Sequence, residues 1–196
     1  MTKTDVRIFN PTELGELEAN MWIAYYNHRF ARLAWMLFTL NYGHFKLHIL
    51  TTLRASYHVA AATILFRKTK GHEETDRILR HLIIYCHLLS DHELQPFDYI
   101  KAAKLELDWW FIDRYPERYT TTRAIGLAEA AAARFNMEPH LFRRYGQKRA
   151  AAMELLGAYH HDPTTVVDWK RLRRYLNESY QALHDTVSNT QKSTTA

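Results

Sequence analysis

The sequence predicts an all-α protein built as one bundle of about seven helices. Three observations support this. The chain has 196 residues with only 6 Gly and 5 Pro, too few for the many turns of an all-β protein or for a disordered chain. Apolar residues recur at helical spacing between caps and breakers, and no useful strand alternation occurs. The connections are short, so neighbouring helices should be antiparallel.

The first predicted helix opens at a strong N-terminal signal. Asn10 is a favourable N-cap, Pro11 suits the first helical position, and Glu13 supplies the carboxylate three residues after the cap. The pattern then stays helical as far as Tyr42, where Gly43 suits a C-terminal stop. We therefore expect one long helix at the start of the bundle.

Polar loops and prolines separate the next three predicted helices. They cover about residues 44–68, 73–89 and 98–115. Asp98 can cap the last of these, and Pro116 ends it because proline cannot continue the helical hydrogen-bond ladder.

Three further helices are predicted in the last third of the chain, at about residues 122–135, 138–159 and 165–186. The second of them contains Gly146, where a break is compatible with the pattern. A capping-box pattern from Thr165 to Asp168 starts the last one.

The predicted division of the chain is simple: an N-terminal extension (1–9), one helical bundle domain (10–188) and a disordered tail (189–196). The longest uninterrupted apolar run, Leu33 to Phe38, is too short to span a membrane. This run is apolar on all sides, so it should lie centrally in the bundle or be covered by another subunit in a homo-oligomer. The start of the chain has no apolar signal region, so we expect a cytoplasmic protein.

Composition excludes several classes of function. The single cysteine, Cys86, rules out an intramolecular disulfide framework and a cysteine-based zinc site, and its apolar surroundings suggest a small core residue. The chain has no nucleophile elbow, no Walker loop and no dinucleotide-binding glycine motif. The net charge of +5 is compatible with an acidic partner without identifying one.

Helical spacing predicts that three charged residues face the core. Residues three and four positions away share a helix face, so a charged residue with only non-polar neighbours there should be buried. Glu18, Glu106 and Arg149 pass this test. Their neighbours are Leu14, Gly15, Met21 and Trp22 for Glu18, Ala102, Ala103, Trp109 and Trp110 for Glu106, and Tyr145, Gly146, Ala152 and Met153 for Arg149. Glu129 and Glu154 also pass it, but their neighbours are only Ala, Gly and one Ile, which permits an exposed residue.

A lone buried carboxylate costs several kcal/mol unless it is paired, protonated or metal-bound. One interpretation is a structural ion pair of Glu18 or Glu106 with Arg54 or Arg149. Another is a polar pocket that binds a small molecule, with Glu18 or Glu106 doing general acid–base work if the protein is an enzyme. The residues expected to bind the ligand are Arg149, His58, Trp22, Tyr25, Trp110 and Tyr180.

A metal centre is the third interpretation. Glu18, His58 and Glu106 come from three predicted helices and could together bind Fe, Mn or Zn. The chain lacks the Glu-x-x-His motif of ferritin-like dimetal bundles, so the site would be mononuclear or irregular. His44 and His48 have the spacing of a metal pair, but they should lie in solvent at a helix start.

A nucleic-acid-binding alternative rests on residues 122–149, which have the pattern of a helix-turn-helix. Asn136 could take a left-handed turn conformation, and Phe142 and Tyr145 would pack inward. A basic run at residues 170–174 could extend the contact surface. The residues expected to face outward are Glu138, His140, Arg143, Arg144, Gln147 and Lys148.

Five segments of the chain form a distinctive pattern: Glu18-x-x-Met21-Trp22-x-x-Tyr25-Tyr26, Glu106-x-x-Trp109-Trp110, Arg149-x-x-x-Met153, Asp168-Trp169 and Ser179-Tyr180-x-x-Leu183. Together they resemble an uncharacterised bacterial family of all-helical proteins, to which no activity, cofactor or partner is attached. The resemblance runs from about Glu13 to His184. It implies that Glu18, Glu106 and Arg149 belong to the pattern of the family.

Overall fold

The computed structural model describes residues 3–161 and 166–194, and within them the protein is all-α, as the sequence predicts. These residues form no strand beyond one isolated bridge between Thr4 and Glu93. The eight α-helices of this part of the chain are α1 (Pro11–Tyr26), α2 (Phe30–Thr39), α3 (Ile49–Lys68), α4 (Thr75–His92), α5 (Tyr99–Arg114), α6 (Arg123–Phe135), α7 (Arg143–His161) and α8 (Trp169–Thr194).

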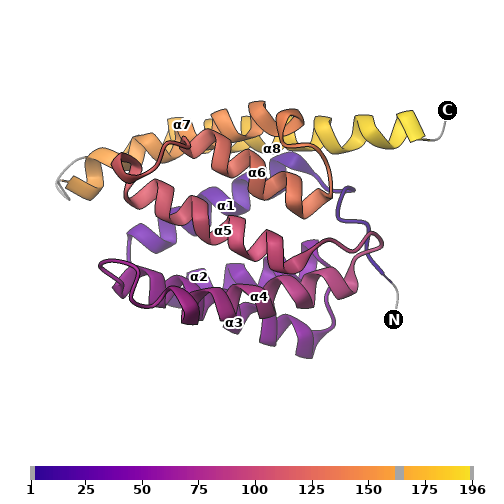
Figure 1. The fold of residues 1–196 in the computed structure, drawn as a ribbon, viewed down its shortest axis with the longest axis horizontal. Coiled ribbons are helices and arrows are strands. Elements are labelled where there is room, and N and C mark those ends of the chain that lie inside the picture. The colour runs from indigo at the N-terminus through magenta and orange to yellow at the C-terminus, as the bar shows by residue number, and fades with distance from the viewer. Residues whose placement is uncertain (1–2, 162–165, 195–196) are drawn as a thin grey trace.

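The helices form a closed ring in chain order. Each α-helix packs against the next one along the chain, and α8 packs back against α1. Figure 1 shows α2, α3 and α4 along the lower side of the molecule and α7 and α8 along the upper side, with α1 and α5 between them. A ring of this kind places the inward side chains of many helices around one central space.

The expected caps are present at three helix starts. The side chain of Asn10 accepts hydrogen bonds from the backbone N–H groups of Thr12 and Glu13 and thereby caps α1. Asp98 caps α5 in the same way, and Thr122 caps α6. Each cap satisfies donors that the first helical turn leaves without an internal partner.

The long first helix predicted to reach Tyr42 is instead divided into two. α1 ends at Tyr26, and α2 begins at Phe30 after His28 adopts a left-handed conformation with φ 55°. A short π-helical turn, η1 (Leu40–His44), then continues α2. The apolar periodicity runs across the turn, so the sequence pattern gave no sign of this break.

The structure also revises the C-terminal helices. A 3₁₀ turn, η3 (Pro139–Phe142), precedes α7, which continues without a break through Gly146, where the pattern also allowed one. α8 runs to Thr194, so the tail from residue 189 is helical as far as it is described. Thr165 lies outside the described residues. Asp168 caps α8 by accepting a hydrogen bond from the backbone N–H of Arg171 at 2.9 Å.

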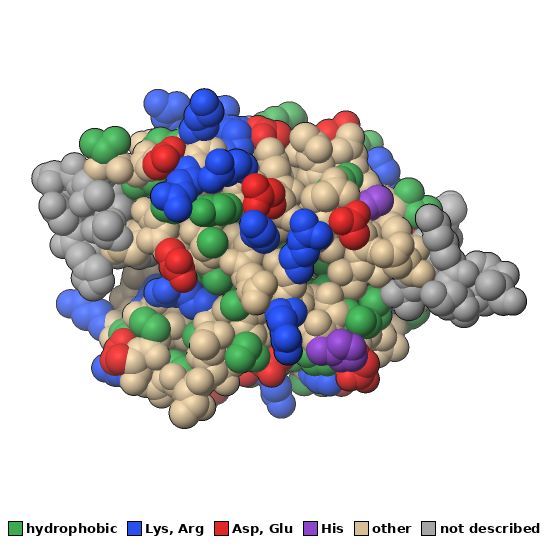
Figure 2. All heavy atoms as spheres, turned by 90° about the horizontal axis from the view of Figure 1, so that it is seen from above, with side chains coloured by type: hydrophobic (Ala, Val, Ile, Leu, Met, Phe, Trp, Pro, Cys, Tyr) green, Lys and Arg blue, Asp and Glu red, His purple; other side chains and the backbone are tan. Residues whose placement is uncertain are grey.

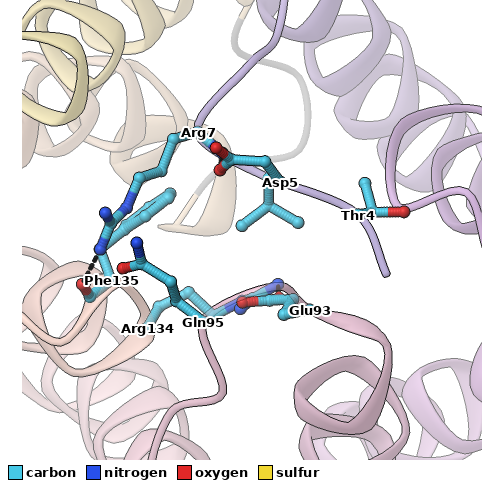
Figure 3. Close-up of a pocket in the computed structure, with 8 residues that line it drawn as sticks. Thr4, Asp5, Arg7, Glu93, Gln95, Arg134 and Phe135 are labelled. Atoms are coloured by element: carbon cyan, nitrogen blue, oxygen red, sulfur yellow. Dashed lines mark hydrogen bonds and ion pairs between the residues drawn. The ribbon is translucent and has the colours of Figure 1, made fainter. Parts of the chain in front are cut away.

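The N-terminal extension packs against the bundle. Thr4 exchanges backbone hydrogen bonds with the end of α4 and the loop after it, at 2.9 Å to His92 and 2.8 Å to Leu94. Arg7 donates to the backbone oxygen of Phe135 at the C-terminal end of α6, as Figure 3 shows. The segment thus ties together two helices at one end of the ring.

Candidate functional site: a central cavity with a carboxylate–arginine cluster

The ring surrounds a cavity of about 270 Å³ that is partly open to solvent. Seven of the eight helices line it, all but α2, together with η1 and the N-terminal extension. Apolar side chains make up most of its wall, and small residues of α5 and α6 such as Ala102, Ala130 and Ala131 leave the space open. This volume has room for several water molecules or for a small organic molecule. Ligand pockets in proteins have a similar character.

Glu18 and Arg149 form an ion pair in the wall of this cavity. The Nη1 of Arg149 donates to Oε2 of Glu18 at 2.5 Å, and the Nη2 donates to Oε1, so the contact is bidentate. Both residues are 9% exposed. Burial alone would lower the pKa of Arg149, but the neighbouring Glu18 charge raises it well above its usual value. Arg149 therefore stays protonated, and the bidentate contact with Glu18 compensates its buried charge.

Aromatic side chains surround the ion pair. The Nε1–H of Trp22 donates to Glu18 at 3.2 Å, and the Arg149 guanidinium lies 5.8 Å from the centre of the Trp22 ring. Tyr180 hydrogen-bonds Glu18, and Tyr145 hydrogen-bonds Arg149. Burial raises the pKa of both tyrosines, for Tyr145 to about 12. Both phenols stay protonated and can donate hydrogen bonds.

Glu106 faces the same cavity but has no ion pair within the described part of the chain. Its Oε1 accepts a hydrogen bond from the Nε1–H of Trp110 at 3.0 Å, and Trp109 also hydrogen-bonds the carboxylate. Burial raises the pKa of Glu106, and these hydrogen bonds and the more distant Arg149 charge offset that effect only partly. Glu106 thus takes up a proton more readily than an ordinary exposed glutamate.

The other polar residues of the cavity lie on different elements. Burial and the charge of Arg134 lower the pKa of His44 to about 4, so this histidine is neutral at pH 7. Arg134 pairs with Glu93. Burial raises the pKa of the Cys86 thiol to about 12, which makes it unreactive, in keeping with its expected role as a core residue.

Two predicted ligand residues lie away from the cavity. His58 is on the side of α3 that faces α4, and its Nδ1 is 2.9 Å from Nδ1 of His81. Tyr25 contacts Tyr26 and lies under the guanidinium of Arg67, 5.6 Å from the ring centre. The structure therefore brings together Glu18, Trp22, Glu106, Trp110, Arg149 and Tyr180.

The proposed metal ligands are not assembled into a site. Within residues 3–161 and 166–194, no group of three or more His, Cys, Asp or Glu side chains is close enough to hold a metal ion. Glu18 already forms an ion pair with Arg149. His58 contacts His81 on the side of α3 that faces α4, away from the two glutamates. His44 also differs from expectation, because it lines the cavity, whereas His48 is exposed.

The sequence reasoning did not assign Trp109, Tyr145, His44 or Arg134 to the site. Tyr145 was detectable, because it precedes Arg149 by one helical turn and so shares its face. Trp109 flanks Glu106 in the same way. His44 and Arg134 carry no such signal, since only the closure of the ring brings η1 and α6 to the same space.

The comparisons with known proteins identify no relative. No protein-family model, no curated protein and no solved structure matches the chain. The resemblance to a helical family therefore stays an expectation, and the function is argued from the geometry of the cavity.

Proposed function

We propose that the protein binds a small, mainly apolar amine in the central cavity, with the ammonium group at Glu106. The observation that carries the proposal is a carboxyl group that lines a largely apolar cavity and has no ion pair within the described residues. A buried carboxylate without a counter-ion is costly, and a cationic ligand group would supply one. The apolar body of the ligand would fill the space beside Leu82, Leu89 and Leu127.

Glu18 has a supporting part in this proposal. Arg149 already neutralises it, and Trp22 and Tyr180 hold it in place. If the bound molecule reacts, Glu106 is therefore the carboxyl suited to general acid–base work, since burial raises its pKa. The Glu18–Arg149 pair fixes the relative positions of α1 and α7 beside it.

Thermal unfolding in the presence of hexylamine, hexanol or hexanoate tests the proposal. These probes share a chain length and differ in head group. At about 100 times its dissociation constant, hexylamine should raise the melting temperature by roughly 5–10 °C. Glu106→Gln should abolish that rise, because the amide cannot neutralise an ammonium group. Asp108→Asn, an exposed carboxylate on the same helix, serves as the matched control.

Equal stabilisation by all three probes, or an undiminished hexylamine effect in Glu106→Gln, would contradict this assignment of the ligand. If none of the probes stabilises the folded wild-type protein, the amine proposal fails. The structural interpretation, in which the buried charges serve only to fix the helices, then becomes the better account.

A second candidate function is nucleic-acid binding through residues 122–149. The favouring observation is the turn between α6 and α7. Asn136 is left-handed with φ 52°, Phe142 is fully buried, and Arg143 and Arg144 are exposed. However, positively and negatively charged side chains alternate on the surface around this turn. Lys148 pairs with Glu178 at 2.7 Å, and Figure 2 shows Lys and Arg side chains mixed with Asp and Glu across the face that contains α7 and α8.

The double variant Arg143→Ala/Arg144→Ala tests this candidate. On a DNA duplex of about 20 base pairs, it should lower the affinity and reduce the slope of log K against log salt by about 2. Arg32→Ala/Arg54→Ala removes the same charge from another face and is the control. Equal DNA affinity of the wild type and the Arg143/Arg144 variant would remove this candidate.

A further inference from the structure

A second surface of the protein, formed by α2, η1 and α3, is unusually apolar. We call it the hairpin face. Within the described residues, fourteen large apolar side chains are exposed, and eight of them lie in these three elements. Exposed apolar groups gathered in one region mark an interaction surface. The eight are Phe30, Trp35, Tyr42, Ile49, Leu50, Leu53, Tyr57 and Ile64, with exposed fractions from 46% to 70%.

On α3, the exposed residues lie opposite the packed ones. Leu53, Tyr57 and Ile64 recur at helical spacing along one side of the helix. Ala55 and Ala62 lie on the other side and are fully buried against the bundle. α3 therefore has apolar residues on both sides, but only one side packs against the rest of the protein.

On α2, aromatic rings continue this surface. Trp35 stacks on Phe38 at 5.7 Å, and Phe38 stacks on Tyr42 at 5.8 Å between ring centres. α2 lies against α3, because the guanidinium of Arg67 near the end of α3 is 5.3 Å from the ring of Phe30 at the start of α2. The segment from Leu33 to Phe38 is thus only partly buried, through residues such as Met36 and Leu37.

The charge of this region has a single sign. Residues 19–72 contain no Asp or Glu and seven Lys or Arg, all of which are exposed. None of the seven forms a salt bridge with a carboxylate in the described structure. The whole chain has a net charge of +5, so the rest carries 5 − 7 = −2. The seven are Arg29, Arg32, Lys46, Arg54, Arg67, Lys68 and Lys70.

We infer that the hairpin face docks on the surface of an anionic lipid bilayer. Trp35, Tyr42, Leu50 and Leu53 would enter the boundary between headgroups and acyl chains, and the basic residues would contact lipid phosphates. An apolar helical face with aromatic residues and a Lys/Arg excess is the composition of interfacial helices. Basic residues are attracted to anionic headgroups within a Debye length of the surface.

The charge argues against two other occupants. A second copy of the chain would bring seven positive charges against seven, without an acidic residue between 19 and 72 to pair with them. A protein partner is generally contacted through an interface whose core is depleted in lysine, with positive and negative groups that fix the register. An anionic bilayer does not require charged groups to be aligned at fixed positions. Its negative headgroups can pair with positive side chains spread over a wide area.

The fold favours docking along the membrane over crossing it. Among the described helices, α3 alone is long and apolar enough to cross a bilayer, and only 17% of its most apolar 18-residue window is buried in the protein. Crossing would remove Ala55 and Ala62 from their contacts with the rest of the core and would place Arg54 in the hydrocarbon. Docking keeps those contacts and exposes only the outer side to lipid.

Co-sedimentation with vesicles tests the inference. The wild-type protein should bind vesicles of phosphatidylcholine and phosphatidylglycerol and should not bind phosphatidylcholine alone. Leu50→Glu/Leu53→Glu should abolish binding because it places charges in the acyl boundary. Ile125→Glu is the matched control, since Ile125 is 50% exposed on α6 and Leu53 is 53% exposed on α3. Arg32→Gln/Arg54→Gln should weaken binding roughly 25-fold, about fivefold per residue.

Arg143→Gln/Arg144→Gln removes the same charge from α7 and should bind vesicles like the wild type. The inference is overturned if the wild type does not bind the anionic vesicles, or if the hairpin-face variants bind them as it does. It is also overturned if light scattering shows a dimer that Leu50→Glu/Leu53→Glu dissociates while no vesicle binding occurs. Helical circular dichroism of each variant confirms folding, and none of these results depends on ligand binding in the cavity.

Discussion

At the scale of single residues, two glutamates in similar sequence contexts have different chemistry. Glu18 and Glu106 each have a tryptophan four positions later that donates a hydrogen bond to the carboxylate. Arg149 neutralises Glu18, whereas Glu106 keeps a raised pKa at the cavity wall. The difference arises because α7 packs between α6 and α8, which directs Arg149 toward α1.

The pKa of Glu106 predicts a pH dependence of stability. Its pKa is raised in the folded protein above its unfolded value of about 4.3, so between these two values the folded state holds a proton that the unfolded state has lost. The contribution is fully present below about pH 4.3 and is lost as the pH rises through the folded pKa. Urea unfolding of Glu106→Gln at a series of pH values should therefore show a smaller loss of stability with rising pH than the wild type.

Burial also raises the pKa of Glu93, so this residue too makes the protein less stable as the pH rises. The comparison between wild type and variant removes that shared part. Parallel stability curves for the two proteins across this range would show that Glu106 is not the group with a raised pKa.

At the scale of elements, α7 has two glycines with opposite roles. A Cβ at Gly146 would lie 2.1 Å from the backbone oxygen of Ala124, so this glycine permits the close approach of α6 and α7. A Cβ at Gly157 would have no neighbour within 4 Å. Gly146 therefore serves the packing of α7 against α6 and does not end the helix.

These two positions give a matched pair of predictions. Gly146→Ala should destabilise the protein by about 1–3 kcal/mol, because α6 and α7 must move apart. Gly157→Ala should stabilise it by up to about 1 kcal/mol, because alanine is the better helix former in open space. Chemical denaturation measures both free energies of unfolding. A destabilised Gly157→Ala, or a neutral Gly146→Ala, would contradict the packing described here.

At the scale of the whole molecule, ring closure and charge segregation determine what the protein can do. The contact between α8 and α1 closes the ring around the cavity. Residues 19–72, which include α2 and α3, carry seven positive charges and no negative ones, more than the net charge of +5 of the whole chain. The two proposals use different parts of one fold. The amine site lies inside the ring, whereas the lipid surface lies on its outer side.

The sequence by itself determined the fold class, most helix boundaries and the burial of Glu18 and Arg149, whereas Glu106 is half-buried at the cavity wall. These follow from local rules, since caps, breakers and helical periodicity depend on residues within a few positions of one another. The same locality explains the error at His28, where a single left-handed residue divides a continuous apolar pattern.

Only the tertiary structure decided which charged residues pair with one another and that their cluster lines a cavity. Arg149 is 131 residues from Glu18 in sequence. No local pattern favoured the Glu18–Arg149 pair over a pair of Glu106 with Arg149, or over a pair of either glutamate with Arg54, which is exposed in the structure. The exclusion of His58 from the cluster, the entry of His44 and the cavity itself also arise from how the helices close into a ring. Periodicity shows which side of a helix is buried, but the partner on that side is determined by packing between distant segments.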